Sequence, residues 1–183
     1  ICDIQEKFRG PIHEYEKIIL TTKKLIKASE IMSIPVYATT QNRARLGETC
    51  AELSIHNAVE HVDKSAFSMW IPEISRHFEG GKAEIILVGI ESHICVMQTT
   101  LDALKAGHKV YVVADGVSSC NPQEVPVALA RLRAEGATVT TSESLLYEIM
   151  GDAAIPEFKQ IAKLVKETSA DTKAVLVALL SKM

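Results

Sequence analysis

Long apolar runs are missing from this sequence. Its most apolar helical stretch, residues 174–180, is far shorter than the roughly 20 residues that span a bilayer, so no membrane partner is expected. No secretory signal is recognisable at the amino-terminal end. The first residue is Ile1, inside what reads as a strand. A cytoplasmic location is therefore predicted, while organellar targeting by an upstream segment stays open.

Paired disulfide-forming or metal-binding residues are scarce as well. The 4 cysteines show no CxxC or other paired spacing, and the 6 histidines supply no HxxxH or HxH pair. The cysteine pattern is typical of reduced intracellular thiols rather than of a disulfide frame. A histidine-based zinc site lacks its ligands. The sequence therefore predicts neither a disulfide-framed domain nor a metal centre of this kind.

Positive charge and aromatic residues are also in short supply: the formal net charge is −3 and aromatics make up 5%. Nucleic-acid-binding faces are usually basic and often carry stacking aromatics, so a nucleic-acid partner and a nuclease function are disfavoured. A glycine-rich phosphate loop is missing, because residues 89–91 do not open a GxGxxG motif. No nucleotide or other cofactor is expected. Arg43 and Arg45 leave an anionic substrate open, with a solvated loop as the alternative.

What the chain does contain is strand–helix alternation, which is clearest over residues 83–119. The β-branched run 85–88 suits a strand buried on both faces of a parallel sheet. A short turn leads into a helical pattern that Gly107 ends, and a second apolar strand follows. This β-α-β unit places Cys95 in the first turn of a helix, where backbone N–H groups and the helix dipole favour a thiolate.

The rest of the chain extends the alternation, and 183 residues are enough for one compact domain. The predicted strands are residues 1–4, 34–39, 58–62, 85–88, 110–114 and 137–140. The predicted helices are residues 12–32, a short one near Pro72, the one that opens at Cys95, one capped by Asn121, one capped by Ser142, 156–167 and 170–182. This order predicts an α/β fold, a doubly wound six-stranded parallel sheet flanked by helices on both faces in a Rossmann-like arrangement.

The last predicted helix is apolar almost all round, unlike a helix with one solvated face. We expect residues 170–183 to be buried at a subunit interface. The sequence therefore predicts a homo-oligomer.

Three reactive residues follow predicted strands: Asp3, Lys64 and Cys95. In a doubly wound sheet the site lies outside the carboxyl ends of the strands, where the strand order reverses, so these side chains should share one edge. Taken singly, Asp3 could cap a turn, Lys64 could be a solvated surface lysine and Cys95 a small core residue. The other cysteines, Cys2, Cys50 and Cys120, are read as structural, and for Cys120 an exposed position before the helix cap stays open.

Five segments together are characteristic of a known family: CDIQEKF, VDKSAFSMW, GIESHICVMQTTLDAL, VADGVSS and TTSESLLYEIMGDA. They resemble the isochorismatase-like cysteine hydrolase superfamily, and most of all its small isochorismatase-domain-containing members, up to about Glu167. The resemblance implies an Asp-Lys-Cys triad of Asp3, Lys64 and Cys95. It also implies an oxyanion hole of the backbone N–H groups of Glu91 and Cys95, and a cis peptide between Ile90 and Glu91.

The implied activity is metal-independent hydrolysis of a C–N bond in a small amide or ureido compound, through a thioester on Cys95. Where nicotinamidases of the superfamily carry an Asp-x-His metal motif, this chain reads TQNRA over residues 40–44, so no zinc or iron is predicted. Isochorismatases proper lack the nucleophile that Cys95 supplies here, which argues against vinyl-ether hydrolysis. The alternative is an interaction or scaffolding protein that keeps the fold without turnover.

Four further side chains are expected to line the substrate pocket: Phe8, Gln41, Phe67 and His93. For His93, a surface or capping role is the competing interpretation.

Overall fold

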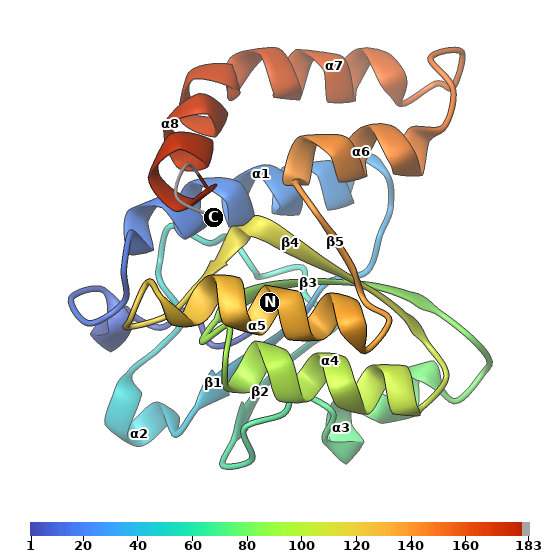
Figure 1. The fold of residues 1–183 in the computed structure, drawn as a ribbon. Coiled ribbons are helices and arrows are strands. Elements are labelled where there is room, and N and C mark those ends of the chain that lie inside the picture. The colour runs from blue at the N-terminus through green and yellow to red at the C-terminus, as the bar shows by residue number, and fades with distance from the viewer. Residues whose placement is uncertain (181–183) are drawn as a thin grey trace.

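The computed structural model describes residues 1–180 (Figure 1). The strands are β1 (Tyr37–Gln41), β2 (Glu60–Lys64), β3 (Glu84–Ile90), β4 (Lys109–Ser118) and β5 (Thr138–Thr140). The helices are α1 (Tyr15–Ile31), α2 (Arg43–Leu46), α3 (Pro72–Ser75), α4 (Cys95–Lys105), α5 (Glu124–Ala134), α6 (Ser142–Met150), α7 (Phe158–Glu167) and α8 (Ser169–Leu180), with 3-10 turns η1 (Glu6–Phe8) and η2 (Arg76–Phe78).

All strand pairs are parallel, and Cys2 joins the two parts of the sheet. β1 pairs with β2, and β3, β4 and β5 pair in that order. Between them Cys2 bridges Thr39 of β1 on one side and Gly89 of β3 on the other. The order across the sheet is therefore β2, β1, the Cys2 segment, β3, β4, β5, and it reverses at the Cys2 segment, as expected for a doubly wound sheet.

The predicted six strands are not confirmed, because the first of them contributes only this bridge. Asp3 has a φ of 51°, which lies outside the extended region. The chain therefore leaves the sheet directly after Cys2, and residues 1–180 contain five strands. The other five predicted strands are present: β1 and β2 are shifted by two or three residues toward their carboxyl ends, and β3 and β4 are longer at both ends than predicted.

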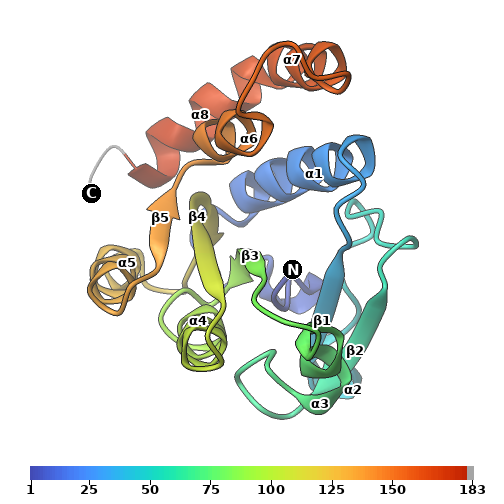
Figure 2. The ribbon, with the colours of Figure 1, turned by 90° about the vertical axis from the view of Figure 1, so that its right-hand side faces the viewer.

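Helices cover both faces of the sheet, as Figure 2 shows. α4 and α5 pack on one face, against β3, β4 and β5, whereas α1 and α6 pack on the other, against β4. α7 packs over α1 and α6, whereas α8 packs on α1 and on β4. β4 is buried along nearly its whole length, which explains why its sequence is continuously apolar rather than alternating.

Two predicted helix caps are wrong. α5 begins at Glu124, and Asn121 lies outside it, its carbonyl oxygen accepting from the Glu124 N–H. α6 is capped by Thr141, whose side chain accepts from the Ser144 N–H. The backbone N–H and hydroxyl of Ser142 instead donate to the buried carboxylate of Asp115. A buried carboxylate without donors costs more free energy than a helix end that water can reach. The spacing of residues in the sequence does not reveal that Asp115 competes for Ser142.

Helix α8 packs one side against its own chain, while Val177 on the same helix is exposed. Val175 and Leu179 belong to the same buried cluster as Ile18 of α1. Lys24 of α1 donates a 2.9 Å hydrogen bond to Thr172, and burial lowers the pKa of Lys24. The end of the predicted interface segment, residues 181–183, lies outside the described residues. Within residues 1–180, no helix has the length and apolarity needed to cross a membrane.

A cavity of about 390 Å³ lies between α1, β1 and β3. Its lining is mainly aliphatic and aromatic, including Leu25, Val36 and Ile86, and it contains none of Asp3, Lys64 and Cys95. This space is therefore separate from the reactive residues at the carboxyl edge.

Candidate active site

The candidate site is built around the carboxylate of Asp3, where the N-terminal segment leaves the sheet. Asp3 is only 1% exposed. Its Oδ1 accepts a 2.7 Å hydrogen bond from Thr39 Oγ1 of the neighbouring strand β1. Its Oδ2 accepts a 2.7 Å hydrogen bond from the ammonium of Lys64. These donors hold the carboxylate of Asp3 in one orientation, so it is not a turn cap.

Lys64 ends β2, and its ammonium is enclosed by oxygen atoms. Besides Asp3, the ammonium donates to Gln41 Oε1 at 2.8 Å and to the carbonyl oxygens of Ala66 and Phe67 at 3.1 and 3.0 Å. The side chain is 1% exposed, so the interpretation as a solvated surface lysine is wrong. A buried ion pair persists only when its remaining donors and acceptors are satisfied, and these contacts satisfy them.

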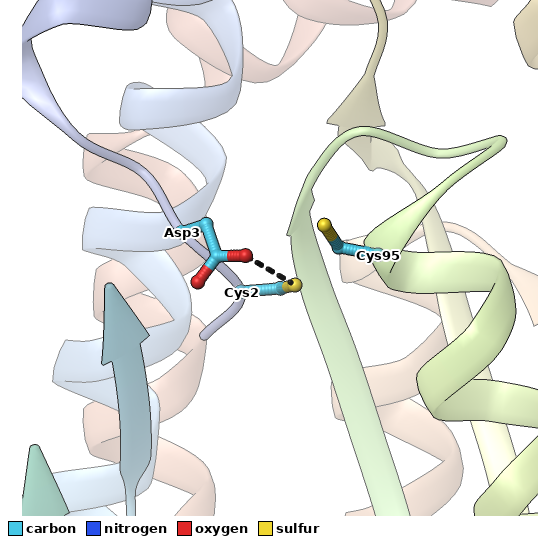
Figure 3. A group of neighbouring side chains, drawn as sticks. All are labelled: Cys2, Asp3 and Cys95. Atoms are coloured by element: carbon cyan, nitrogen blue, oxygen red, sulfur yellow. Dashed lines mark hydrogen bonds between the residues drawn. The ribbon is translucent and has the colours of Figure 1, made fainter. Parts of the chain in front are cut away.

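Cys95 is the first residue of α4 and is 7% exposed. Its Sγ, the Cys2 Sγ and a carboxylate oxygen of Asp3 all lie within 4.8 Å of one another. Figure 3 shows Asp3 and Cys2 projecting from the N-terminal segment and Cys95 from the start of α4. Asp3, Lys64 and Cys95, which are far apart in sequence, therefore meet at one sheet edge.

The turn before Cys95 is fixed by hydrogen bonds at both of its ends. The peptide between Ile90 and Glu91 is cis. The Glu91 carbonyl oxygen accepts from the N–H groups of Ile94 and Val96, and the Glu91 carboxylate accepts from the Cys120 N–H at 2.8 Å. The first N–H groups of a helix have no acceptor within it, and at the start of α4 the Val96 N–H finds its acceptor in this turn, at the Glu91 carbonyl oxygen.

The four expected pocket residues differ in their relation to this centre. Gln41 contacts Lys64 through its side chain, and Phe67 does so through its carbonyl oxygen while its side chain is exposed. His93 Nδ1 is 2.9 Å from Ser119 Oγ, a hydroxyl that also contacts Ser92. Phe8 packs against the apolar cluster that contains Ile4 and Tyr15.

Sequence reasoning missed three residues of the site. Thr39 and Gln5 are buried, and Gln5 ties the segment after Asp3 to the end of β1 through the backbone of Gln41. Cys2 belongs to the hydrophobic core as predicted, but its sulfur also donates to Asp3 Oδ2 at 3.6 Å. Burial raises the pKa of the Cys2 thiol well above its usual range. The adjacency of Cys2 to Asp3 was the available signal.

The residues at the nicotinamidase metal position do not fit a metal ion. Residues 40–44 there, TQNRA, contain no carboxylate and no imidazole, the ligand types that such a site uses. Arg43 Nε donates to Thr40 Oγ1 at 3.1 Å, and a guanidinium has no lone pair to offer a metal ion.

Comparison with known proteins places this geometry in a family. Residues 1–144 match the isochorismatase domain model. The chain is 41% identical over 174 residues to the secreted isochorismatase effector Isc1 of Phytophthora sojae, covering 91% of this chain and 83% of the relative. It is 37% identical over 174 residues to human isochorismatase domain-containing protein 2, covering 94% of this chain and 84% of the relative.

Solved structures agree with this assignment. A structure described as MAR1 ribonuclease from Caenorhabditis elegans has a TM-score of 0.86 and 40% identity, covering 90% of this chain and 86% of that one. Escherichia coli YcaC, described as an octameric hydrolase of unknown specificity, has a TM-score of 0.83 and 21% identity, covering 96% and 89%; at that identity it shows the fold alone. The chain belongs to the isochorismatase domain family.

Proposed function

We propose that the chain is a metal-independent cysteine hydrolase that cleaves a C–N bond of a small amide or ureido compound. The observation that carries the proposal is the Asp3 carboxylate, bound to the Lys64 ammonium at 2.7 Å and within 4.8 Å of the Cys95 sulfur. A nucleophile with a base oriented by a third group is the arrangement that covalent catalysis requires.

In the acylation step, Asp3 accepts the thiol proton of Cys95 and the thiolate attacks the carbonyl carbon of the substrate. The N–H groups of Glu91 and Cys95 donate to the oxyanion that forms, and such a donor is typically worth about 3–4 kcal/mol in the transition state. The tetrahedral intermediate collapses, Asp3 returns the proton to the leaving nitrogen, and ammonia or an amine departs. The product of this step is a thioester on Cys95.

In the deacylation step, Asp3 removes a proton from a water molecule that attacks the thioester. The thiolate of Cys95 leaves and regains its proton from Asp3, which releases the carboxylic acid. Lys64 stays charged throughout and keeps Asp3 ionised between proton transfers. Because Lys64 is enclosed by four oxygen atoms of the protein, it acts by holding charge rather than by moving a proton.

The direct test is to trap the thioester by mixing the protein with a panel of small amides and quenching in acid. We expect intact-mass and peptide mass spectrometry to place an acyl group on Cys95 for at least one compound. The Cys95→Ala variant should show no adduct, whereas Cys120→Ala, which removes an exposed thiol, should behave as wild type. If wild type and Cys95→Ala are alike across the panel, the scaffolding alternative is favoured.

A second candidate function comes from the Caenorhabditis elegans relative, which is named a ribonuclease and is 40% identical. This chain's formal net charge of −3 gives no general attraction for phosphates. Labelled RNA should therefore stay intact at low salt under conditions in which an amide is hydrolysed. RNA cleavage by the wild type that is lost in Cys95→Ala would favour the ribonuclease function over amide hydrolysis.

Self-association is likewise a proposal, and it is supported by the octameric description of YcaC. Exposed apolar side chains, including Val127 at 66% and Val177 at 61%, give two helices surface that a second copy would bury. We expect sedimentation velocity to find a species larger than a monomer at micromolar concentration. A single monomeric species across a wide concentration range would contradict the proposal.

The predicted cytoplasmic location also stays a prediction, and one relative is named as secreted.

A further inference from the structure

Two sulfur atoms, not one, lie beside the carboxylate of Asp3. The Cys2 and Cys95 Sγ atoms are within 4.8 Å of each other, and both come from backbone at the reversal point of the sheet (Figure 3). The other two cysteines have different surroundings: Cys50 is buried 3.1 Å from the Tyr15 hydroxyl, and Cys120 is exposed after β4. The proposed hydrolysis uses Cys95 and leaves Cys2 without a chemical role.

We propose that Cys2 is a resolving cysteine, which forms a reversible disulfide with Cys95 after a peroxide has oxidised Cys95. The oxidant is hydrogen peroxide or an organic hydroperoxide. The disulfide itself depends only on the two thiols and the carboxylate, whereas its consequence for turnover rests on the proposed function.

The first step oxidises Cys95 by two electrons. Asp3 accepts the thiol proton, and the thiolate attacks one oxygen of the peroxide. The O–O bond breaks, Cys95 becomes a sulfenic acid, and the departing hydroxide takes the proton from Asp3 as water. A thiolate with access to solvent is the species that peroxide oxidises. Cys95 is 7% exposed and Cys2 is 0% exposed, so Cys95 is the sulfur that peroxide reaches.

The second step forms the S–S bond. The Cys2 thiol donates toward Asp3 Oδ2 at 3.6 Å, so the same carboxylate accepts its proton. The Cys2 thiolate attacks the Cys95 sulfur, the S–O bond breaks, and the leaving hydroxide takes the proton from Asp3 to form a second water. A small dithiol reverses the reaction by thiol–disulfide exchange, which restores both thiols.

The backbone determines which parts must move. A disulfide needs its sulfur atoms about 2.05 Å apart, so the two Sγ atoms must approach each other. Cys2 is held by hydrogen bonds to β3 on one side, from its N–H to Val88 and from Ile90 to its carbonyl oxygen, and by the bridge to Thr39 on the other. The approach therefore comes from rotation of both side chains and from the first turn of α4.

The proposed disulfide would protect the nucleophile. Without a neighbouring thiol, a sulfenic acid exposed to more peroxide proceeds to sulfinic acid, which simple thiols do not reduce. Attack by Cys2 removes the sulfenic acid before that second oxidation. The cost is temporary loss of the proposed hydrolysis, because the sulfur that attacks substrate is then blocked.

The experiment treats the Cys120→Ala protein, which lacks the exposed thiol that could pair between molecules, with a small excess of hydrogen peroxide. Remaining thiols are then alkylated, and peptides are mapped with and without prior dithiothreitol. We expect a dithiothreitol-sensitive cross-link between the peptides that contain Cys2 and Cys95. With Cys2→Ser added, we expect no such cross-link and about tenfold more Cys95 sulfinic acid at equal peroxide.

Two controls keep the outcome decisive. Cys50→Ala should still form the cross-link, since burial raises the pKa of the Cys50 thiol to about 11 and its sulfur lies outside the pair. If Cys2→Ser misfolds by circular dichroism, Cys2→Ala replaces it. Equal sulfinic acid with and without Cys2, or a wild-type protein without the cross-link, would overturn the proposal. The peptide masses of the cross-link and of the sulfinic acid do not depend on a substrate. A failed amide screen would therefore leave this result unaffected.

Discussion

Replacing Lys64 with methionine is expected to lower the free energy of unfolding by about 3–5 kcal/mol, because it leaves a buried charge without its partner. Asp3 is 1% exposed and, among residues 1–180, would keep the side-chain hydrogen bonds from Thr39 and Cys2. Methionine has a similar length and fills the same space, so the loss reflects charge rather than a cavity. Hydrolysis by the Lys64→Met variant should fall below detection, since the proposed base loses the ammonium that orients its carboxylate at 2.7 Å.

Chemical denaturation with urea and amide turnover measure the two effects. The double variant Asp3→Asn/Lys64→Met removes both charges, and we expect it to recover more than half of the lost stability while remaining inactive. Lys109→Met is the matched surface control: Lys109 lies 3.6 Å from Glu84 in an exposed pair, and its loss should not change stability measurably. A double variant no more stable than Lys64→Met would show that the pair is not coupled.

The parts of the fold that local patterns determine were predictable. The apolar run of β3 and the amphipathic stripe of α1 each bury a surface that their own sequence defines. The length of the first strand was not predictable, because it depends on a backbone reversal at Asp3 with φ of 51°, an angle that aspartate adopts more often than most residues but that its sequence alone does not require. The orientation of α8 against α1 was also missed, because helix–helix contact is a property of the tertiary structure.

For the site too, features that local sequence determines could be predicted, and features that depend on tertiary structure could not. That Asp3, Lys64 and Cys95 share one edge could be inferred, because parallel strands align their carboxyl ends, and the family resemblance gave these residues roles. Cys2 was read only as a core residue although it adjoins Asp3 in the sequence, and Thr39 was not found because its role depends on the order of strands across the sheet. Thr39 becomes a donor to Asp3 only because β1 lies next to the N-terminal segment, an order that no local pattern specifies.

The same neighbour relation makes Gly89 a second position with a large expected effect. A Cβ atom added there would lie 2.1 Å from the carbonyl oxygen of Cys2 and 2.8 Å from its nitrogen. Both are backbone atoms that pair with β3, so a side chain cannot rotate away to relieve the clash. The φ of Gly89 is also 125°, a conformation that L-residues rarely adopt. Gly89→Ala should therefore destabilise the protein by about 4 kcal/mol or more.

The substitution should also separate the reactive groups, because the segment that alanine displaces carries Asp3 next to Cys2. Urea denaturation measures the stability, and Gly80→Ala is the control, since a Cβ atom at that position meets no atom within 4 Å. We expect Gly80→Ala to match wild type in both stability and turnover. A Gly89→Ala protein that kept wild-type stability would mean that Cys2 does not pair with β3. Asp3 and Lys64 would then not be held in a fixed position relative to Cys95, because the contact between Cys2 and Gly89 joins the two parts of the sheet that carry these residues.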